Sequence, residues 1–139
     1  MRNMQELDGA LAETEQWIDD FMLRLGWHDR GKVYAALIGT LHALRDSLPR
    51  DEVVYLGAQM PPLLRGLYYE GWHPVARVGA KTRNAFLERI HEAVHHDPGV
   101  DTEQVALAAL ALLAARLPAS ELEDAKASTP KPLRSLWPV

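Results

Sequence analysis

The amino-acid sequence predicts an all-α protein of six to eight helices, built from two tandem copies of a helical unit of about sixty residues. Apolar residues recur three and four positions apart in several segments, which is the spacing of one face of an amphipathic helix. No segment alternates apolar and polar residues with a period of two, so strands are not expected. The third observation is a repeat, because ten residues recur without a gap when the sequence is shifted by 69 positions.

The repeat is concentrated in residues 41–67, which match residues 110–136. The identical pairs are Leu41 and Leu110, Leu44 and Leu113, Leu48 and Leu117, Pro49 and Pro118, Glu52 and Glu121, Ala58 and Ala127, Pro61 and Pro130, Leu64 and Leu133, Arg65 and Arg134, and Leu67 and Leu136. Further upstream, residues 17–25 and 86–94 share apolar character at helical spacing. The likeness therefore extends to the start of each unit.

The two copies are expected to form a single domain that spans residues 1–139. We divide it into unit one (10–70), a linker rich in glycine and proline (71–80) and unit two (81–139). A helical unit of this size buries too little apolar surface to be stable alone. The copies are therefore expected to pack against each other about a pseudo-twofold axis and to share one interior.

Four helical segments are predicted in the first unit. Residues 17–25 place apolar side chains on one stripe, and Gly26 follows as a C-terminal stop. A second helix carries its apolar face over residues 33–48 and ends where a proline interrupts the amide ladder. A short third helix covers about 51–59, and a proline then opens a last turn or short helix over 61–68.

The second unit is expected to repeat this order of helices. The Asp-Pro-Gly segment at 97–99 breaks the chain, and Asp101 followed by Gln104 resembles an N-cap with a capping box. The apolar helix that follows covers 105–117. Thirteen residues are too few to cross a hydrocarbon core, which needs about twenty. This segment is therefore predicted to be a buried helix.

Composition excludes several classes of function. The chain has no cysteine, which rules out disulfides, thiolate zinc sites and cysteine nucleophiles. Its net charge of −4 and its scattered basic residues give no patch for nucleic acid or an anionic membrane, so neither partner is expected. Residues 1–15 are polar and acidic and do not resemble a signal peptide. A cytoplasmic location is the resulting expectation.

Several motifs resemble those of a known family. They are LHALRDSLP (41–49), AQMP (58–61) and LRGLYYEGW (64–72), followed in the second half by Glu121, Pro130 and LRSLW (133–137). With these motifs the chain resembles the bacterial family called domain of unknown function 2267 over nearly its whole length. The resemblance implies a bacterial helical domain, and it supplies no activity and no functional residue.

The segment His91-Glu92-Ala93-Val94-His95 matches the pattern H-E-x-x-H on a predicted helix. If both imidazoles project from one helix face, His91 and His95 could hold zinc while Glu92 activates the bound water. That chemistry belongs to a zinc-dependent hydrolase. A third ligand would have to come from elsewhere, with Glu121 or Glu123 as candidates.

Two interpretations of these histidines without a catalytic role stay open. The unit-one positions equivalent to His91, Glu92 and His95 are Met22, Leu23 and Gly26, so the repeated unit carries no such site. One alternative is adventitious metal binding through His91, His95 and His96. The other is a solvated helix end, where histidines suit the helix dipole. We therefore expect no cofactor, with zinc as the alternative.

Two further groups of residues are candidate binding sites. Each unit pairs a glutamate with an arginine thirteen residues later, Glu52 with Arg65 and Glu121 with Arg134. An ion pair or a carbonyl cap that fixes the turn is the structural interpretation, and a shared anion site formed by the two arginines is the alternative.

The aromatic segment at the junction of the units is the other candidate. Tyr69, Trp72 and His73 belong to this segment and have no counterparts that would mark them as part of the repeat. Exposed aromatic residues anchor many interfaces, so these three form a candidate contact surface for a partner or ligand.

These features favour a non-catalytic interaction or ligand-binding module of a bacterial cytoplasm. Its partner is expected to be a protein or a small ligand, and a homodimer could form through residual apolar helix faces. A nucleophile triad and a phosphate-binding glycine loop are both missing from the sequence, which speaks against catalysis. The alternative is a zinc-dependent hydrolase that uses His91, His95 and Glu92.

Overall fold

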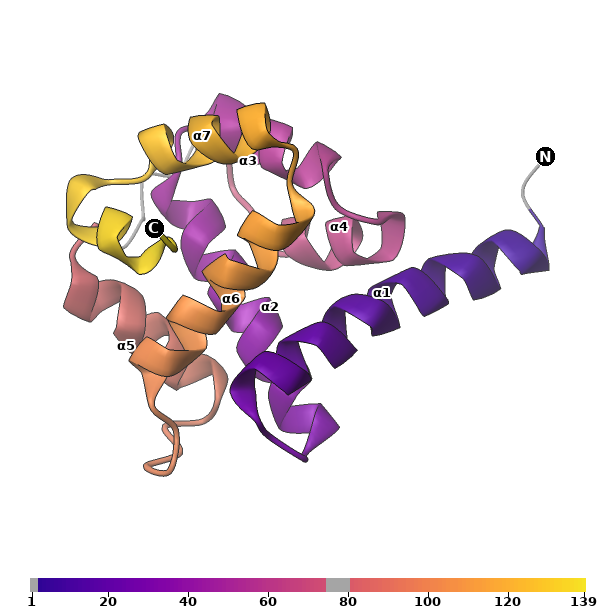
Figure 1. Cartoon of the computed structure of the whole chain (residues 1–139), viewed down its shortest axis with the longest axis horizontal. Helices are drawn as coiled ribbons and strands as arrows, with labels where there is room; N and C mark the ends of the chain where they lie inside the picture. Colours follow the sequence, from indigo (N-terminus) through magenta and orange to yellow (C-terminus); the bar gives the residue numbers. More distant parts are fainter. Residues whose placement is uncertain (1–2, 75–80) are drawn as a thin grey trace.

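The computed structural model describes residues 3–74 and 81–139, and these residues contain helices and no strand (Figure 1). The helices are α1 (Met4–Leu25), α2 (Arg30–Ser47), α3 (Arg50–Ala58), α4 (Pro62–Tyr69), α5 (Arg83–Ala93), α6 (Thr102–Arg116), α7 (Ala119–Ser128) and the 3-10 helix η1 (Lys131–Leu136). The prediction of an all-α protein with six to eight helices is therefore confirmed. Most of the predicted linker, residues 75–80, lies outside the described residues. None of the described helices combines the length and apolar character needed to span a bilayer.

Local chemistry accounts for several helix ends. Gly26 adopts a left-handed φ of 71° after α1, as the predicted stop requires. The carboxylate of Asp101 accepts hydrogen bonds from the backbone N–H groups of Glu103 and Gln104, which confirms the predicted N-cap of α6. The side chain of Gln104 donates to the carbonyl of Leu25 instead of completing a capping box. Gln104 thus links the start of α6 to the end of α1.

Buried side chains from both halves of the chain form one apolar cluster. Helix α2 packs on α5, and α6 packs on α1, while α2 also contacts α6 and α3 contacts α7. Under the shift of 69 residues, the pairing of α2 with α5 is the counterpart of the pairing of α6 with α1. Exchange of contacts in this way is what the predicted pseudo-twofold arrangement requires, and the duplication itself stays a prediction.

Helix ends recur at the same offset. Helices α2 and α6 end at Ser47 and Arg116, and α3 and α7 begin at Arg50 and Ala119. Helix α5 begins at Arg83, whose counterpart in α1 is Thr14. Residues 4–13 of α1 therefore have no counterpart in α5. The sequence predicted this helix only from residue 17, so its N-terminal part is longer than expected.

We call residues 3–13 the arm. Figure 1 shows α1 projecting from the body of the protein toward the N-terminus. Its apolar side chains remain in contact with solvent, since Met4, Leu7 and Leu11 are 69%, 62% and 51% exposed. The first buried residue of α1 is Thr14, so the arm is the part of this helix that the fold leaves uncovered.

Candidate functional site

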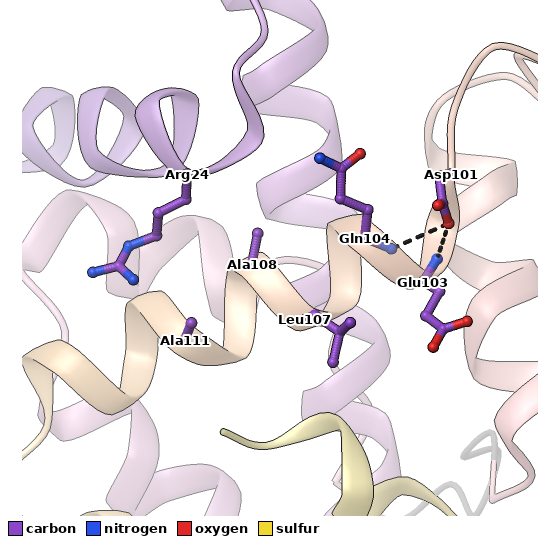
Figure 2. A pocket seen from close by; sticks show the side chains of 7 residues that line it. All are labelled: Arg24, Asp101, Glu103, Gln104, Leu107, Ala108 and Ala111. Atoms are coloured by element: carbon purple, nitrogen blue, oxygen red, sulfur yellow. Dashed lines mark hydrogen bonds between the residues drawn. The ribbon is translucent and has the colours of Figure 1, made fainter. Parts of the chain in front are cut away.

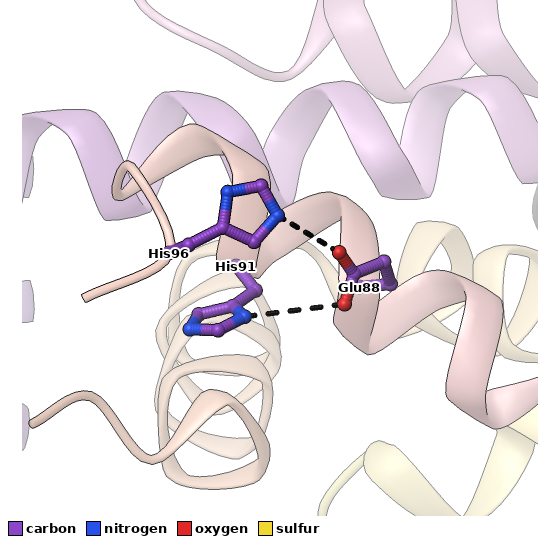
Figure 3. A group of neighbouring side chains, drawn as sticks. All are labelled: Glu88, His91 and His96. Atoms are coloured by element: carbon purple, nitrogen blue, oxygen red, sulfur yellow. Dashed lines mark hydrogen bonds and ion pairs between the residues drawn. The ribbon is translucent and has the colours of Figure 1, made fainter. Parts of the chain in front are cut away.

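A cluster of two histidines and a glutamate lies at the C-terminal end of α5 (Figure 3). Nε2 of His96 lies 2.9 Å from one carboxylate oxygen of Glu88, and Nδ1 of His91 lies 3.9 Å from the other. The two imidazole rings meet edge to face, with centroids 4.8 Å apart. One ligand atom from each residue lies within 4.8 Å of the other two. In the part of the chain that the structure describes, this is the group with the arrangement of a metal site.

The histidine that joins His91 is His96 and not His95. Helix α5 ends at Ala93, and the backbone φ is 57° at His95 and 54° at His96. Because both residues adopt the left-handed conformation, the chain reverses sharply and carries His96 back over α5. His95 is exposed and lies beyond the helix. The premise that His91 and His95 project from one helix face is therefore wrong.

The remaining residues of the hydrolase interpretation lie outside this cluster. Glu92 is exposed on α5, whereas Glu121 and Glu123 belong to α7. Within the described ranges, none of the three joins a group with metal-site geometry. Glu88 was missed by the sequence analysis, although its position three residues before His91 on a helix was a usable signal.

The imidazole of His91 is held from its other side. Its Nε2 lies 3.3 Å from the carbonyl oxygen of Asp97, so the tautomer that donates there leaves the Nδ1 lone pair facing Glu88. The Asp97 carboxylate accepts from the N–H of Gly99 and lies 3.0 Å from Nζ of Lys32. The hydrogen bond from Gly99, followed by that from Lys32, lowers the pKa of Asp97 below its ordinary value. The turn after α5 is thereby tied to α2.

The two repeated arginines act as carbonyl caps. Arg65 donates from Nε to the carbonyl of Gly57 and from Nη2 to that of Met60, at 3.0 and 2.9 Å. Arg134 donates from Nε to Thr129 and from Nη2 to Ala127, at 2.8 and 3.0 Å. Each guanidinium thus closes the C-terminal end of the preceding short helix, α3 or α7. This arrangement matches the carbonyl-cap interpretation, and both arginines are occupied by their own units.

The glutamates of the same repeat lie where α3 meets α7. The Glu52 side chain is almost covered, with 7% of the residue exposed. Burial raises the pKa of Glu52, and the nearby carboxylates of Asp124 and Glu121 raise it further. Within residues 3–74 and 81–139, Glu52 forms no ion pair with Arg65, and Glu121 forms none with Arg134. The charged form of the Glu52 side chain is therefore destabilised in the folded protein, by burial and by the neighbouring negative charges.

Replacement of Glu52 by glutamine is expected to raise the free energy of unfolding at pH 7 by up to about 1 kcal/mol. A carboxyl whose pKa is raised on folding binds its proton more tightly in the folded state, so wild-type stability increases as the pH falls through that folded pKa. Glu52→Gln should abolish this increase. Urea unfolding between pH 4 and 7 measures it, with the exposed Glu123→Gln on α7 as control. A Glu52→Gln variant less stable than wild type at pH 7 would contradict the assignment.

The aromatic segment at the junction is largely packed against the core. The Tyr69 ring lies 5.0 Å from the Tyr68 ring and 5.5 Å from the Trp72 ring, measured between centroids. Tyr69 and Trp72 are partly buried, whereas His73 is exposed. Tyr69 and Trp72 thus contact each other at the C-terminal end of α4, and His73 follows them in the chain. Their role as a contact surface stays a prediction.

An apolar groove of about 910 Å³ lies between the arm and the start of α4. Its lining includes Met4, Leu7 and Ala10 of the arm, together with Pro62 and Leu63 of α4. Acidic residues Glu6 and Glu13 also line it. This surface was not predicted from the sequence, although the spacing of Met4, Leu7 and Leu11 continues the apolar stripe of residues 17–25 toward the N-terminus.

A second hollow of about 580 Å³ lies between the end of α1 and the outer face of α6 (Figure 2). Figure 2 shows Ala108 and Ala111 on α6 below Arg24 of α1. The polar groups around it already have partners, because Arg24 pairs with Asp20 and Asp101 caps α6. This hollow therefore offers a ligand little beyond two alanines and Leu107.

The fold and these surfaces define a small all-helical domain with a peripheral histidine cluster and an uncovered apolar arm. Residues 14–136 match the family model described as "Uncharacterized conserved protein (DUF2267)". The chain belongs to this family, as the resemblance of its motifs predicts. No curated protein matches the chain. The matched region begins at Thr14, the first buried residue of α1, so the arm lies outside it.

Proposed function

We propose that this protein is a non-catalytic interaction module that binds a basic amphipathic helix of a partner protein in the groove between the arm and α4. The single observation that carries the proposal is the uncovered apolar stripe of the arm. Contiguous apolar surface of this kind marks interaction sites on soluble proteins more often than scattered exposed residues do. A helix that enters such a groove is one of the common modes of peptide recognition.

The stripe has the spacing of a helix-pairing seam. Met4, Leu7 and Leu11 are followed at alternating steps of three and four by Thr14, Ile18, Phe21 and Leu25. The C-terminal part of this stripe packs into the core, where Phe21 and Leu25 are buried. The arm repeats the same apolar pattern without a neighbour on its exposed side. A second apolar helix laid along the arm would cover it as the core covers the rest of α1.

The charge of the arm selects the kind of helix. The arm contains Glu6, Asp8 and Glu13 and no lysine or arginine. A partner helix with lysine or arginine beside its apolar stripe would meet these carboxylates favourably. The arm of a second copy would bring another three carboxylates to the same surface. Charge therefore favours a basic partner over pairing between two arms.

Binding of model peptides tests the proposal. The probe is a helical peptide of leucine and lysine with a 3.5-residue apolar repeat, and its comparison is the same peptide with glutamate in place of lysine. We expect the basic peptide to bind at least about tenfold more tightly, because opposite charges meet across the groove. Its affinity should fall with added salt. Isothermal titration calorimetry with the full chain measures both affinities.

Substitutions in the apolar stripe distinguish binding of the peptide in the groove from nonspecific attraction between opposite charges. Met4→Ser and Leu7→Ser, at two apolar residues that line the groove, are each expected to weaken the basic peptide about tenfold, since each removes an apolar contact worth more than 1 kcal/mol when buried. Leu23→Ser is the matched control, because Leu23 is an 84% exposed leucine of the same helix outside the groove. Equal weakening by Leu23→Ser, or equal binding of both peptides, would overturn the proposal. A dimeric mass of the wild type in light scattering would also overturn it if Leu7→Ser restored the monomeric mass, since a second copy of the chain would then occupy the groove.

A further inference from the structure

The geometry points to a divalent transition-metal site formed by Glu88, His91 and His96, at the end of α5 and independent of the arm. Two imidazoles and one carboxylate are a ligand set that suits Zn²⁺, Ni²⁺, Cu²⁺ and Co²⁺. Mg²⁺ and Ca²⁺ prefer sites made of oxygen ligands, so neither is expected to bind here. The site shares only His91 with the H-E-x-x-H pattern: its second imidazole is that of His96 instead of His95, and its third ligand is Glu88, whereas Glu92 of the pattern would be a base and not a ligand.

The spacing of the ligand atoms fits one small ion. In a tetrahedral zinc site with bonds of about 2.0 to 2.1 Å, neighbouring ligand atoms lie ~3.4 Å apart. The distance from Oε1 of Glu88 to Nε2 of His96 is 2.9 Å, and that from the other oxygen, Oε2, to Nδ1 of His91 is 3.9 Å, so the two values bracket this separation. All three ligand atoms lie within 4.8 Å of one another. Small side-chain rotations would therefore place an ion in contact with all three residues.

The backbone holds the ligands in this arrangement. The N–H of His96 donates to the carbonyl of His91 at 2.8 Å, which fixes the reversal after α5. Two successive non-glycine residues with positive φ are an unfavourable conformation, and such strain is concentrated at functional sites. Here its consequence is specific, because the reversal turns the His96 side chain toward Glu88 (Figure 3). The strained turn is an independent observation beside the spacing of the ligand atoms.

The orientation of His91 is also that of a metal ligand. A coordinating histidine usually donates its second ring N–H to a carbonyl or carboxylate, which sets the tautomer and orients the ring. Nε2 of His91 faces the carbonyl of Asp97 at 3.3 Å, and Nδ1 faces Glu88. The salt bridge of Asp97 with Lys32 of α2 holds this segment in place. The tautomer of His91 that donates from Nε2 to this carbonyl would place the Nδ1 lone pair on the side of Glu88, where an ion could bind.

Metal titration of untagged full-length protein tests the site. Native mass spectrometry and isothermal titration calorimetry with ZnCl₂ should show one Zn²⁺ per chain, whereas MgCl₂ should show none. Glu88→Gln, His91→Asn and His96→Asn are each expected to weaken Zn²⁺ binding at least about tenfold. Asparagine is chosen at His96 because it tolerates the left-handed backbone. Circular dichroism of each variant confirms that the helices persist.

His95→Asn is the matched control, since it makes the same change at the neighbouring left-handed residue whose side chain lies outside the cluster. Unchanged Zn²⁺ affinity in this variant, together with the loss in His96→Asn, supports the site. Equal loss in His95→Asn would assign the metal to the linear H-E-x-x-H pattern and overturn the proposal. The absence of stoichiometric Zn²⁺ in the wild type, or affinity unaffected by all four substitutions, would also overturn it. None of these outcomes depends on whether the arm binds a partner helix.

Discussion

Replacement of Arg45 by alanine is expected to lower the free energy of unfolding by about 3 to 5 kcal/mol, the range for breaking a buried ionic network. Arg45 is only 4% exposed. Its Nη1 donates to the carbonyls of Tyr68 and Glu70 at 2.8 and 2.7 Å, which closes the C-terminal end of α4. Its Nε and Nη2 donate to the carboxylate of Asp46 at 2.8 and 3.1 Å. Alanine would leave the α4 carbonyls without these donors and open a cavity between α2 and α4.

Urea unfolding at pH 7 measures the effect, and two variants sharpen it. Arg89→Ala removes the other arginine bound to Asp46, but Arg89 is partly exposed, so we expect a loss of about 1 kcal/mol or less. Arg45→Lys should recover little, because one ammonium cannot reproduce a fork that serves two carbonyls and a carboxylate. A loss below 1 kcal/mol for Arg45→Ala, or full recovery with lysine, would show that the network does not hold α4 in place.

The same network has a pH signature. Burial alone would raise the pKa of Asp46, but the hydrogen bonds from Arg45 and Arg89 outweigh it and lower the pKa below its ordinary value of 3.8. A carboxyl whose pKa is lowered on folding contributes stability that is present above its unfolded pKa and is lost as the pH falls through its folded pKa. Acid unfolding of the wild type should therefore be steepest below about pH 4, and Arg45→Ala should make it shallower.

Replacement of Gly39 by alanine is expected to destabilise the protein by about 2 to 3 kcal/mol, at the upper end of the range for overpacking. A Cβ atom at Gly39 of α2 would lie 2.2 Å from Cβ of Ala93 at the end of α5. Neither atom belongs to a flexible side chain, so α2 and α5 would have to move apart. The gain in helix propensity from glycine to alanine is about 1 kcal/mol and is too small to compensate.

The double variant Gly39→Ala with Ala93→Gly tests this contact directly. It returns the missing space to the other helix, so most of the lost stability should be recovered. Gly66→Ala is the matched control, because a Cβ there meets nothing within 4 Å, and it should be neutral or slightly stabilising. Thermal and urea unfolding of the wild type, Gly39→Ala, Ala93→Gly and the double variant give the coupling free energy. Additive effects of the two substitutions would contradict a close crossing of α2 and α5.

Much of the helical architecture could be predicted because its signals are local. The stop at Gly26 and the cap at Asp101 depend on the backbone conformation and the side chain of single residues. The prolines before α3 and α7 act within one turn of the chain. Each such signal involves neighbours in sequence, so the amino-acid order already contains it. The prediction of the carbonyl caps made by Arg65 and Arg134 was open to an alternative, because their partners lie several residues away.

The ligands of the candidate metal site could not all be predicted from the sequence. The pattern at 91–95 directed attention to the correct turn of α5, yet in the structure His96 and not His95 lies beside His91, and the carboxylate that joins them is that of Glu88, which lies outside the pattern. The pattern presumes that the helix continues through His95, whereas α5 ends at Ala93. Packing against α2, including the salt bridge from Lys32 to Asp97, holds the turn that follows. A contact between helices distant in sequence is invisible to a five-residue pattern.

The sequence by itself determined most of the helical segments, where several of them stop, and which family the chain resembles. Only the tertiary structure decided which apolar residues are covered. Leu11 and Leu25 occupy the same stripe of α1, but Leu25 is buried and Leu11 is exposed. The physical reason is that burial depends on how far α2 and α6 extend along α1, and periodicity within one helix carries no information about the length of its neighbours.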